Sequence, residues 1–455
     1  MCTNYINVHI IYKFMDERAK NLLRNLNPWW EEKEIEVPVF ERKLLGTIRK
    51  DLKLKQILAI SGLRRVGKTV IMMQVIKGLA GPADNICYIS FDDISFQDYE
   101  KAMELVDYFL AGSDRGKTRF LFLDEIQKVP HWADLLKVIY DTYDKLKTVI
   151  SGSASLEVRG EKETLAGRMF TYNLPPLCFR EFVRFHGMDP GEPEKPIMRW
   201  YDRELLGNKQ RYEELFDRWL IGGAFPEMLG VDDFGHIKRY LNEAVIDKAI
   251  IDTARLAGEN PVLIHELFRV LAGSNAQLFE NVNLASILGI NRNKVAHCID
   301  LLEKTLLIST SRNYSASIAK QARTSKKVYL AHSSLVLAIL DWPAEVLMTD
   351  AVGHIVEAAV ANGVHARFFW KGVQNGEVDI ILDTKPPIPI EVKYQANVTT
   401  ADAKSLIKFC ERNKIKHGMI ITKQAFDPMK INGIDVLFVP AWVFLLYGPS
   451  IQSGI

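Results

Sequence analysis

Residues 62–69 carry a pattern that is typical of phosphate binding. They read Gly-Leu-Arg-Arg-Val-Gly-Lys-Thr and fit G-x-x-x-x-G-K-[ST] at every fixed position. The glycines let backbone N–H groups turn inward around phosphate oxygens. Lys68 is expected to reach the β- and γ-phosphates of ATP, and the Thr69 hydroxyl is expected to hold Mg²⁺. The expected nucleotide-binding residues are Gly62, Leu63, Arg64, Arg65, Val66, Gly67, Lys68, Thr69 and Val70.

A second polar group follows the apolar run at residues 120–123. Asp124 stands where a buried strand would end, and it is expected to hold the water shell of the Mg²⁺ ion. Glu125 is the expected base that polarises the attacking water. Ser151 or Ser153, after the next apolar run, is a candidate for a hydrogen bond to the γ-phosphate or to that water. The alternative for either serine is a small polar residue at an ordinary strand end.

Arg168 is a third candidate, in the segment Leu165-Ala166-Gly167-Arg168. An arginine here either stabilises transition-state charge, including on an adjacent subunit of a homo-oligomer, or forms a surface ion pair. The sequence alone does not distinguish these two roles of Arg168.

The segments around these residues predict how they are positioned. Residues 57–60 are apolar and short, as in a buried parallel strand, and an amphipathic helix follows the glycine loop. Further strands are expected at 85–93, 119–125 and 148–153, separated by helical stretches. Strand–helix alternation predicts an α/β fold with a parallel sheet covered on both faces, which binds its ligand at the carboxyl ends of the strands. The polar residues named above all fall at those ends.

Composition sets wider limits. A chain of 455 residues suggests about two to four domains. The net charge of +2 gives no global argument for nucleic acid, so such a claim must rest on a local patch. The five cysteines are scattered, with no zinc-type spacing, and favour reduced thiols. The sequence shows neither a membrane-spanning run nor a signal-peptide pattern, so we expect a cytoplasmic protein with no membrane partner.

The second half predicts two further modules. Helices at 264–272, 283–289 and 291–302, with a short turn before the third, have the spacing of a helix-turn-helix and suggest a winged helix. The stretch 309–328 contains five basic residues, Lys326 and Lys327 among them, and no acid, as in a wing that touches phosphates. The alternative is a winged helix used for protein packing, with a solvated basic loop. The DNA-contact candidates are Arg292, Lys294, Arg312, Lys320 and Arg323.

The last hundred residues hold a second chemical constellation. Asp379 lies on one expected strand, and Glu391 and Lys393 share a face of the next, because strand side chains alternate. Glu357 is on a helix that could reach the same place. Carboxylates with a lysine are what a Mg²⁺-dependent phosphodiester cutter needs, and the pattern is similar to the PD-(D/E)xK nuclease superfamily. The alternative is an inherited nuclease-like fold that binds without cutting.

The chain as a whole resembles the prokaryotic AAA-type ATPases that carry a C-terminal domain of unknown function. The resemblance starts near Asn27 and implies ATP binding and hydrolysis, whereas a biological role is not established for that family. One departure is visible, because this chain has His332-Ser333-Ser334 where the family usually has Asp-Thr-Gly. The segments that carry the resemblance are 62–69, 90–93, 123–127, 151–153, 165–168, 176–182 and 222–227.

Together these patterns predict an ATP-hydrolysing switch or motor that acts on DNA or a protein partner. The alternatives are an ATP-gated, Mg²⁺-dependent DNA nuclease and a nucleotide-dependent scaffold without cleavage. The expected segments are a lead-in at 1–36, the ATPase domain at 37–186, a linker and helical connector at 187–262, the winged helix at 263–340 and an α/β nuclease-like domain at 341–455.

Overall fold

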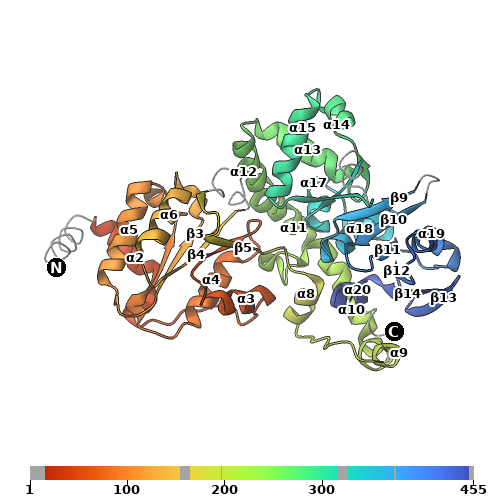
Figure 1. Cartoon of the computed structure of the whole chain (residues 1–455), viewed down its shortest axis with the longest axis horizontal. Helices are drawn as coiled ribbons and strands as arrows, with labels where there is room; N and C mark the ends of the chain where they lie inside the picture. Colours follow the sequence, from red (N-terminus) through yellow and green to blue (C-terminus); the bar gives the residue numbers. More distant parts are fainter. Residues whose placement is uncertain (1–15, 154–163, 196, 316–324, 373–375, 450–455) are drawn as a thin grey trace. The chain divides into compact units, whose positions relative to one another are not determined.

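The computed structural model describes residues 16–153, 164–195, 197–315, 325–372 and 376–449. The chain forms two compact units, Met1–Leu174 and Pro175–Ile455 (Figure 1). No helix in the described ranges is both long and apolar enough to cross a membrane.

The first unit is built on a five-stranded sheet in the order β2-β3-β4-β1-β5. Every neighbouring pair is parallel, which confirms the predicted parallel α/β sheet. The fifth strand, at the edge beside β1, was not predicted. The strands are β1 (Ile57–Ser61), β2 (Ile86–Ser90), β3 (Arg119–Asp124), β4 (Leu146–Gly152) and β5 (Met169–Asn173).

Helices cover both faces of this sheet. Side chains alternate between the faces of a strand, so Ile57 and Ala59 of β1 join one apolar core while Leu58 and Ile60 point to the other side. That core includes residues of α2, α5 and α6. Figure 1 shows α3 and α4 on the opposite side of the sheet from α5 and α6. The helices are α2 (Glu17–Leu26), α3 (Lys43–Asp51), α4 (Lys68–Lys77), α5 (Tyr99–Gly112) and α6 (Trp132–Thr142).

The edge strand β2 is closed by the segment that follows α2. The Asn27 side-chain amide donates to the Tyr88 carbonyl at 2.8 Å, and its oxygen accepts from the Tyr88 N–H at 2.6 Å. The indole N–H groups of Trp29 and Trp30 both donate to the Ile86 carbonyl. These side chains satisfy backbone groups that an edge strand otherwise leaves open.

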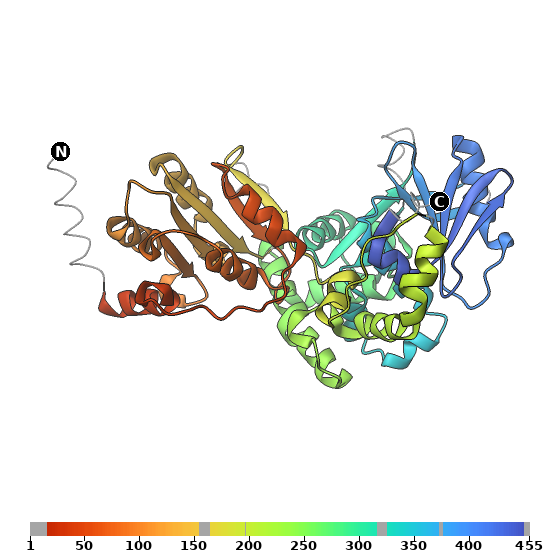
Figure 2. The ribbon, with the colours of Figure 1, turned by 90° about the horizontal axis from the view of Figure 1, so that it is seen from below.

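The second unit begins with helices and ends with a large sheet (Figures 1 and 2). Three π-helical stretches, Tyr201–Leu205, Trp219–Gly223 and Leu241–Ile246, continue or join its first helices. The helices are α8 (Phe179–Phe185), α9 (Ile197–Trp200), α10 (Lys209–Arg218), α11 (Phe234–Tyr240), α12 (Asp247–Ala257), α13 (Pro261–Gly273), α14 (Asn281–Leu288), α15 (Arg292–Lys304), α17 (Ser333–Ile339), α18 (Val352–Gly363), α19 (Lys404–Asn413) and α20 (Ala441–Tyr447).

One mixed sheet runs through the whole second unit, in the order β13-β14-β12-β11-β10-β9-β7-β8-β6. The hairpin β7–β8 is antiparallel, and β7 pairs in parallel with β9 at Arg312↔Phe368. The expected winged-helix and nuclease-like segments therefore share a sheet. The strands are β6 (Leu278–Phe279), β7 (Ile308–Asn313), β8 (Lys326–Leu330), β9 (Phe368–Lys371), β10 (Glu377–Leu382), β11 (Ile388–Lys393), β12 (His417–Thr422), β13 (Asp427–Ile431) and β14 (Ile434–Pro440).

The His332-Ser333-Ser334 segment begins α17. His332 Nδ1 accepts from the Ser334 N–H at 3.2 Å and caps the helix, and Ser333 Oγ donates to the Leu220 carbonyl at 2.6 Å. His332 Nε2 is buried with no hydrogen-bond partner among the described residues. Burial lowers the pKa of His332 to about 3, so its ring is neutral in the folded chain.

Asn27→Ala is expected to lower the free energy of unfolding by about 1–3 kcal/mol, because it leaves the Tyr88 backbone groups unpaired in a buried place. Urea unfolding measures this, with the exposed Asn173→Ala in the same unit as a matched control. Equal stability of the two variants would show that the edge strand does not need this side chain.

His332 is expected to make stability depend on pH. Its folded pKa of about 3 lies below the unfolded value of 6.5, so the unfolded chain binds the proton first and stability falls as pH drops below 6.5. Relative to His332→Gln, the wild type should lose about 1.4 kcal/mol per pH unit between pH 6 and 4. The exposed His236→Gln should keep the wild-type slope. If the free energy of unfolding of wild type and of His332→Gln changed equally with pH, the His332 ring would not be buried and neutral.

Candidate functional site

The glycine loop joins the carboxyl end of β1 to the start of α4. At Gly62 an added Cβ would lie 2.5 Å from the Leu174 carbonyl oxygen, so only glycine fits. Gly67 has φ 97° and precedes the first residue of α4, Lys68. No side chain in the described part of the chain caps this helix, which leaves the N–H groups of its first turn available for an anion. The loop therefore has the geometry of a phosphate site.

Asp124 is the centre of the site. Its side chain is 2% exposed, and Oδ2 accepts from Thr69 Oγ1 and from the Tyr88 hydroxyl, each at 2.7 Å. Oδ1 accepts from Ser151 Oγ. A hydroxyl and a carboxylate side by side at a phosphate loop are oxygen donors of the kind that Mg²⁺ takes, so the residues present fit Mg²⁺ with a nucleotide.

Lys68 and Glu125 lie next to this pair. The Lys68 ammonium donates to the carbonyls of Gly62 at 3.2 Å and Leu63 at 3.1 Å, and it lies 3.6 Å from Glu125 Oε1. Glu125 has φ 54°, a left-handed conformation that costs a residue with a side chain about 1–2 kcal/mol. Ser151 Oγ accepts from its N–H at 3.3 Å, and Gln127 donates to its Oε2 at 2.6 Å. The structure thus brings together Lys68, Thr69, Asp124, Glu125 and Ser151.

Arg168 lies elsewhere. Its carbonyl accepts from the N–H of Ile57, at the amino end of β1, whereas the phosphate loop follows the carboxyl end of that strand. The guanidinium holds Asp141 through two bonds, at 3.0 and 3.1 Å. Arg168 therefore lies at the amino ends of the strands, whereas the nucleotide site of its own chain lies at their carboxyl ends. A role on a second copy stays a prediction.

Sequence reasoning missed two members of the site. Tyr88 reaches Asp124 from the neighbouring strand, where β2 and β3 pair with Ser90 opposite Asp124. Burial, and then the charge of Asp124, raises the pKa of Tyr88, so its hydroxyl stays protonated and donates. The other is Gln127, which orients Glu125. The signal available for Tyr88 was its place on the strand that ends at Ser90. Gln127 lies in segment 123–127, which carries the family resemblance, but no role was predicted for it.

The DNA-contact candidates are only partly described. Arg292 and Lys294 are exposed near the start of α15, and Arg312 is exposed on β7. Lys294 forms an ion pair with Glu259 at 3.0 Å. Lys320 and Arg323 lie outside the described residues. Lys327 is not part of an exposed basic stretch as expected, because its side chain is 3% exposed and lies among carboxylates.

The acids at the C-terminal end of the chain meet around Lys327. Its ammonium lies 2.9 Å from Glu357 Oε1, 3.0 Å from Asp379 Oδ1 and 2.6 Å from Glu377 Oε1. Glu391 Oε1 accepts from Lys393 at 2.6 Å. Within the described ranges no group of three or more His, Cys, Asp or Glu is arranged to hold a metal ion. Glu357, Asp379 and Glu391 are brought close together, but they are held by lysines.

Burial and neighbouring charges together set the pKa values in this cluster. It raises the pKa of Glu391 to about 8, with a further upward contribution from the charge of Asp379. Burial and Asp379 also raise the pKa of Glu357, against the effect of Lys327. Burial alone would lower the pKa of Lys327, but Asp379 and Glu357 outweigh it and the pKa rises. Lys327 is therefore charged.

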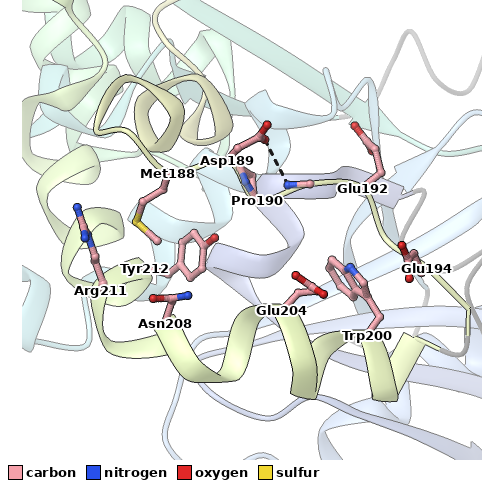
Figure 3. Close-up of a pocket in the computed structure, with 11 residues that line it drawn as sticks. Met188, Asp189, Pro190, Glu192, Glu194, Trp200, Glu204, Asn208, Arg211 and Tyr212 are labelled. Atoms are coloured by element: carbon pink, nitrogen blue, oxygen red, sulfur yellow. Dashed lines mark hydrogen bonds between the residues drawn. The ribbon is translucent and has the colours of Figure 1, made fainter.

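A separate hollow of about 400 Å³ lies beside α9 and α10 (Figure 3). Trp200 and Tyr212 form part of its wall, and four acids line it. Each acid is paired with an arginine, Arg203 serving two of them, and Arg211 also lines the hollow. These acids are therefore already engaged, and we do not take the hollow as a second candidate site. The pairs are Asp189–Arg184, Glu192–Arg180, Glu194–Arg203 and Glu204–Arg203.

Three family models match successive parts of the chain. Residues 54–183 match the model described as AAA domain. Residues 213–346 and 351–442 match two domains of unknown function, DUF8612 and DUF4143. With the phosphate loop and its parallel sheet, the first match identifies a P-loop AAA-type ATPase domain, as the sequence predicted.

Relatives of similar length exist in archaea and bacteria. An uncharacterized protein of Methanocaldococcus jannaschii is 24% identical over 445 residues, which cover 91% of this chain and 89% of that protein. One from Haemophilus influenzae is 22% identical over 410 residues, covering 84% and 93%.

Solved structures give looser likenesses. The Aeropyrum pernix ORC1 protein in complex with DNA has a TM-score of 0.30 and 12% identity, covering 69% of this chain and 96% of that one. A signal transduction ATPase with numerous domains and a tetratricopeptide repeat sensor from Pyrococcus horikoshii has a TM-score of 0.28 and 13% identity. The match covers 73% of this chain and about half, 46%, of that one.

Ser151→Ala is expected to lower the free energy of unfolding by about 1–3 kcal/mol, because Asp124 loses a buried donor and the Glu125 N–H loses its acceptor. Urea unfolding measures this, with the exposed Thr142→Ala in the same unit as control. A variant as stable as the control would show that Ser151 does not support this pair.

Proposed function

We propose that this protein binds ATP with Mg²⁺ in its first unit and hydrolyses it. The observation that carries the proposal is the 2.7 Å contact between Thr69 Oγ1 and Asp124 Oδ2 beside the glycine loop, with Lys68 and Glu125 next to it. A structural turn has no need for a buried lysine, a buried aspartate and a strained glutamate in one place.

The chain's own groups suit each part of the ligand. The N–H groups of the loop and of the first turn of α4 would bind phosphate oxygens. Lys68 would exchange its contacts with the Gly62 and Leu63 carbonyls for the β- and γ-phosphates. Thr69 and Asp124 would hold Mg²⁺, which neutralises phosphate charge when it is bound. Tyr88 and Ser151 keep the Asp124 carboxylate oriented for that task.

Glu125 is the proposed base. Gln127 holds its Oε2, which leaves Oε1 to accept a proton from the attacking water. Lys68 lies 3.6 Å from Oε1, so the carboxylate stays close to the phosphate loop. Ser151 fixes the backbone of Glu125 through its N–H.

The second unit is the proposed working end of a nucleotide-dependent switch, with DNA or a protein as the partner. Support for DNA comes from Arg292 on α15 and Arg312 on β7, which are both exposed. Lys294 gives less support, because Glu259 already neutralises it. This small patch leaves a protein partner as an equal candidate.

The two alternative functions rest on weaker ground. A Mg²⁺-dependent nuclease needs carboxylates free to bind metal, and Glu357 and Asp379 each give an oxygen to Lys327. A scaffold with slow turnover does not explain why Glu125 has a strained, left-handed backbone conformation. Such strain is often found at functional sites.

Lys68→Ala is expected to reduce ATP hydrolysis by about a hundredfold or more, because the ammonium that stabilises phosphate charge is lost. Steady-state phosphate release measures this, and the exposed Lys77→Ala on the same helix is the matched control. Hydrolysis that persists in Lys68→Ala would place the activity in a contaminant or another site.

Glu125→Gln separates binding from hydrolysis. Hydrolysis should fall by about a hundredfold while ATP still binds, because only the proton acceptor is lost. The same hydrolysis assay, repeated with duplex and single-stranded DNA, distinguishes a DNA partner from a protein partner. If DNA raises the rate of ATP hydrolysis and Arg292→Glu abolishes that increase, DNA is the partner. A rate that is unaffected by DNA would direct the search to proteins. If Glu125→Gln hydrolyses ATP at the wild-type rate, Glu125 is not the base.

A further inference from the structure

Lys327 is buried at the point where three carboxylates converge. Its ammonium contacts Glu357, Asp379 and Glu377 at 2.9, 3.0 and 2.6 Å. The ammonium donates hydrogen bonds to Glu357 and Asp379 and forms an ion pair with Glu377. A lysine that is 3% exposed in this setting serves as a fixed counter-ion and cannot also contact a phosphate outside.

The continuous sheet is what places this lysine. Lys327 is on β8, Glu357 on α18, and Glu377 and Asp379 on β10. In the sheet, β7 and β9 separate β8 from β10, and the Lys327 ammonium lies 5.8 Å from the centre of the Phe369 ring on β9. The lysine therefore extends across the face of the sheet, from the expected winged-helix segment to the expected nuclease-like segment.

A hollow of about 540 Å³ adjoins the cluster, so the oxygens available to a metal ion, and not the space, decide whether one fits. Asp379 Oδ2 accepts from the Val392 N–H at 2.9 Å, and Glu391 Oε1 accepts from Lys393. Glu391 Oε2 is buried without a partner among the described residues, and Glu357 Oε2 lies 4.0 Å from His354 Nδ1. A divalent ion needs several oxygens pointing at one position, and here the Lys327 ammonium stands between Glu357 and Asp379. The residues do not fit the Mg²⁺ site that a PD-(D/E)xK nuclease requires.

We propose that Lys327 is the resident cation of this cluster, in the place that a divalent metal would need, so that the second unit neither binds Mg²⁺ here nor cuts nucleic acid. The lysine instead joins the hairpin β7–β8 to α18 and β10. The hairpin carries Arg312 on β7, the strand that pairs with β9, and so the cluster helps to fix a candidate contact surface to the body of the unit.

The direct test is Mn²⁺ binding to the nucleotide-free protein, followed by electron paramagnetic resonance. In the wild type, Asp379→Asn should leave Mn²⁺ binding unchanged, because the Lys327 ammonium already pairs with these carboxylates. Lys327→Met should gain one Mn²⁺ site, at least about tenfold tighter than any in the wild type, since the acids lose their counter-ion. That site should disappear in Lys327→Met/Asp379→Asn. The adjacent Lys326→Met is the matched control, because alternate strand residues face opposite sides.

Thermal unfolding gives a second readout that does not need a metal. Lys327→Met should lower the Tm by about 10 °C, because buried carboxylates are left unpaired. Adding Asp379→Asn to the same chain should restore part of that loss. A double variant as unstable as the sum of both single variants would contradict the pairing.

The wild-type measurement stands even if Lys327→Met does not fold. A wild-type Mn²⁺ site that Asp379→Asn abolishes, or Mg²⁺-dependent nicking of plasmid DNA that needs Asp379, would overturn the proposal. Neither result would affect the ATPase assignment, because Asp379 lies in the second unit and the nucleotide site lies in the first.

Discussion

A charge that is taken out of water must be paired, and this constraint shapes both units. Asp124 in the first unit and Lys327 in the second are almost fully buried, and unpaired they would cost several kcal/mol each. Asp124 accepts hydrogen bonds from three hydroxyls, which can make way for a cation. Lys327 is paired with three carboxylates and is itself the cation among them. The same constraint thus gives one site, around Asp124, that can accept a cation, and one, around Asp379, that already contains a lysine.

The open site depends on weak, exchangeable contacts. Lys68 holds two loop carbonyls and a glutamate at 3.6 Å, all of which a phosphate would replace with stronger charge-assisted bonds. Around it the scaffold is closely packed and hydrogen-bonded, because the Leu174 carbonyl lies against Gly62 and Asn27 binds the edge strand that carries Tyr88. Exchangeable contacts on a closely packed frame are what a nucleotide-dependent switch requires. The frame is local to the first unit and is complete within it.

Much of this could be predicted from the sequence because the signals are local. The glycine loop, the strand that ends at Asp124, and the parallel sheet each follow from a few neighbouring residues. The edge strand β5 was missed because its residues are half exposed and carry no apolar run. Lys327 was misread because its neighbours in the sequence are basic, whereas its partners come from α18 and β10. Strand alternation was the overlooked signal, since Lys326 and Lys327 cannot share a face.

In the proposed nucleotide site, Asp124 holds the cation that accompanies the nucleotide. The most direct measurement is the affinity of the full-length protein for a fluorescent ATP analogue, with and without Mg²⁺, in wild type and Asp124→Asn. We expect Mg²⁺ to tighten binding by about tenfold or more in the wild type, and to have little effect in the variant, because the carboxylate that pairs with the ion is gone. Equal tightening by Mg²⁺ in both proteins would contradict the account.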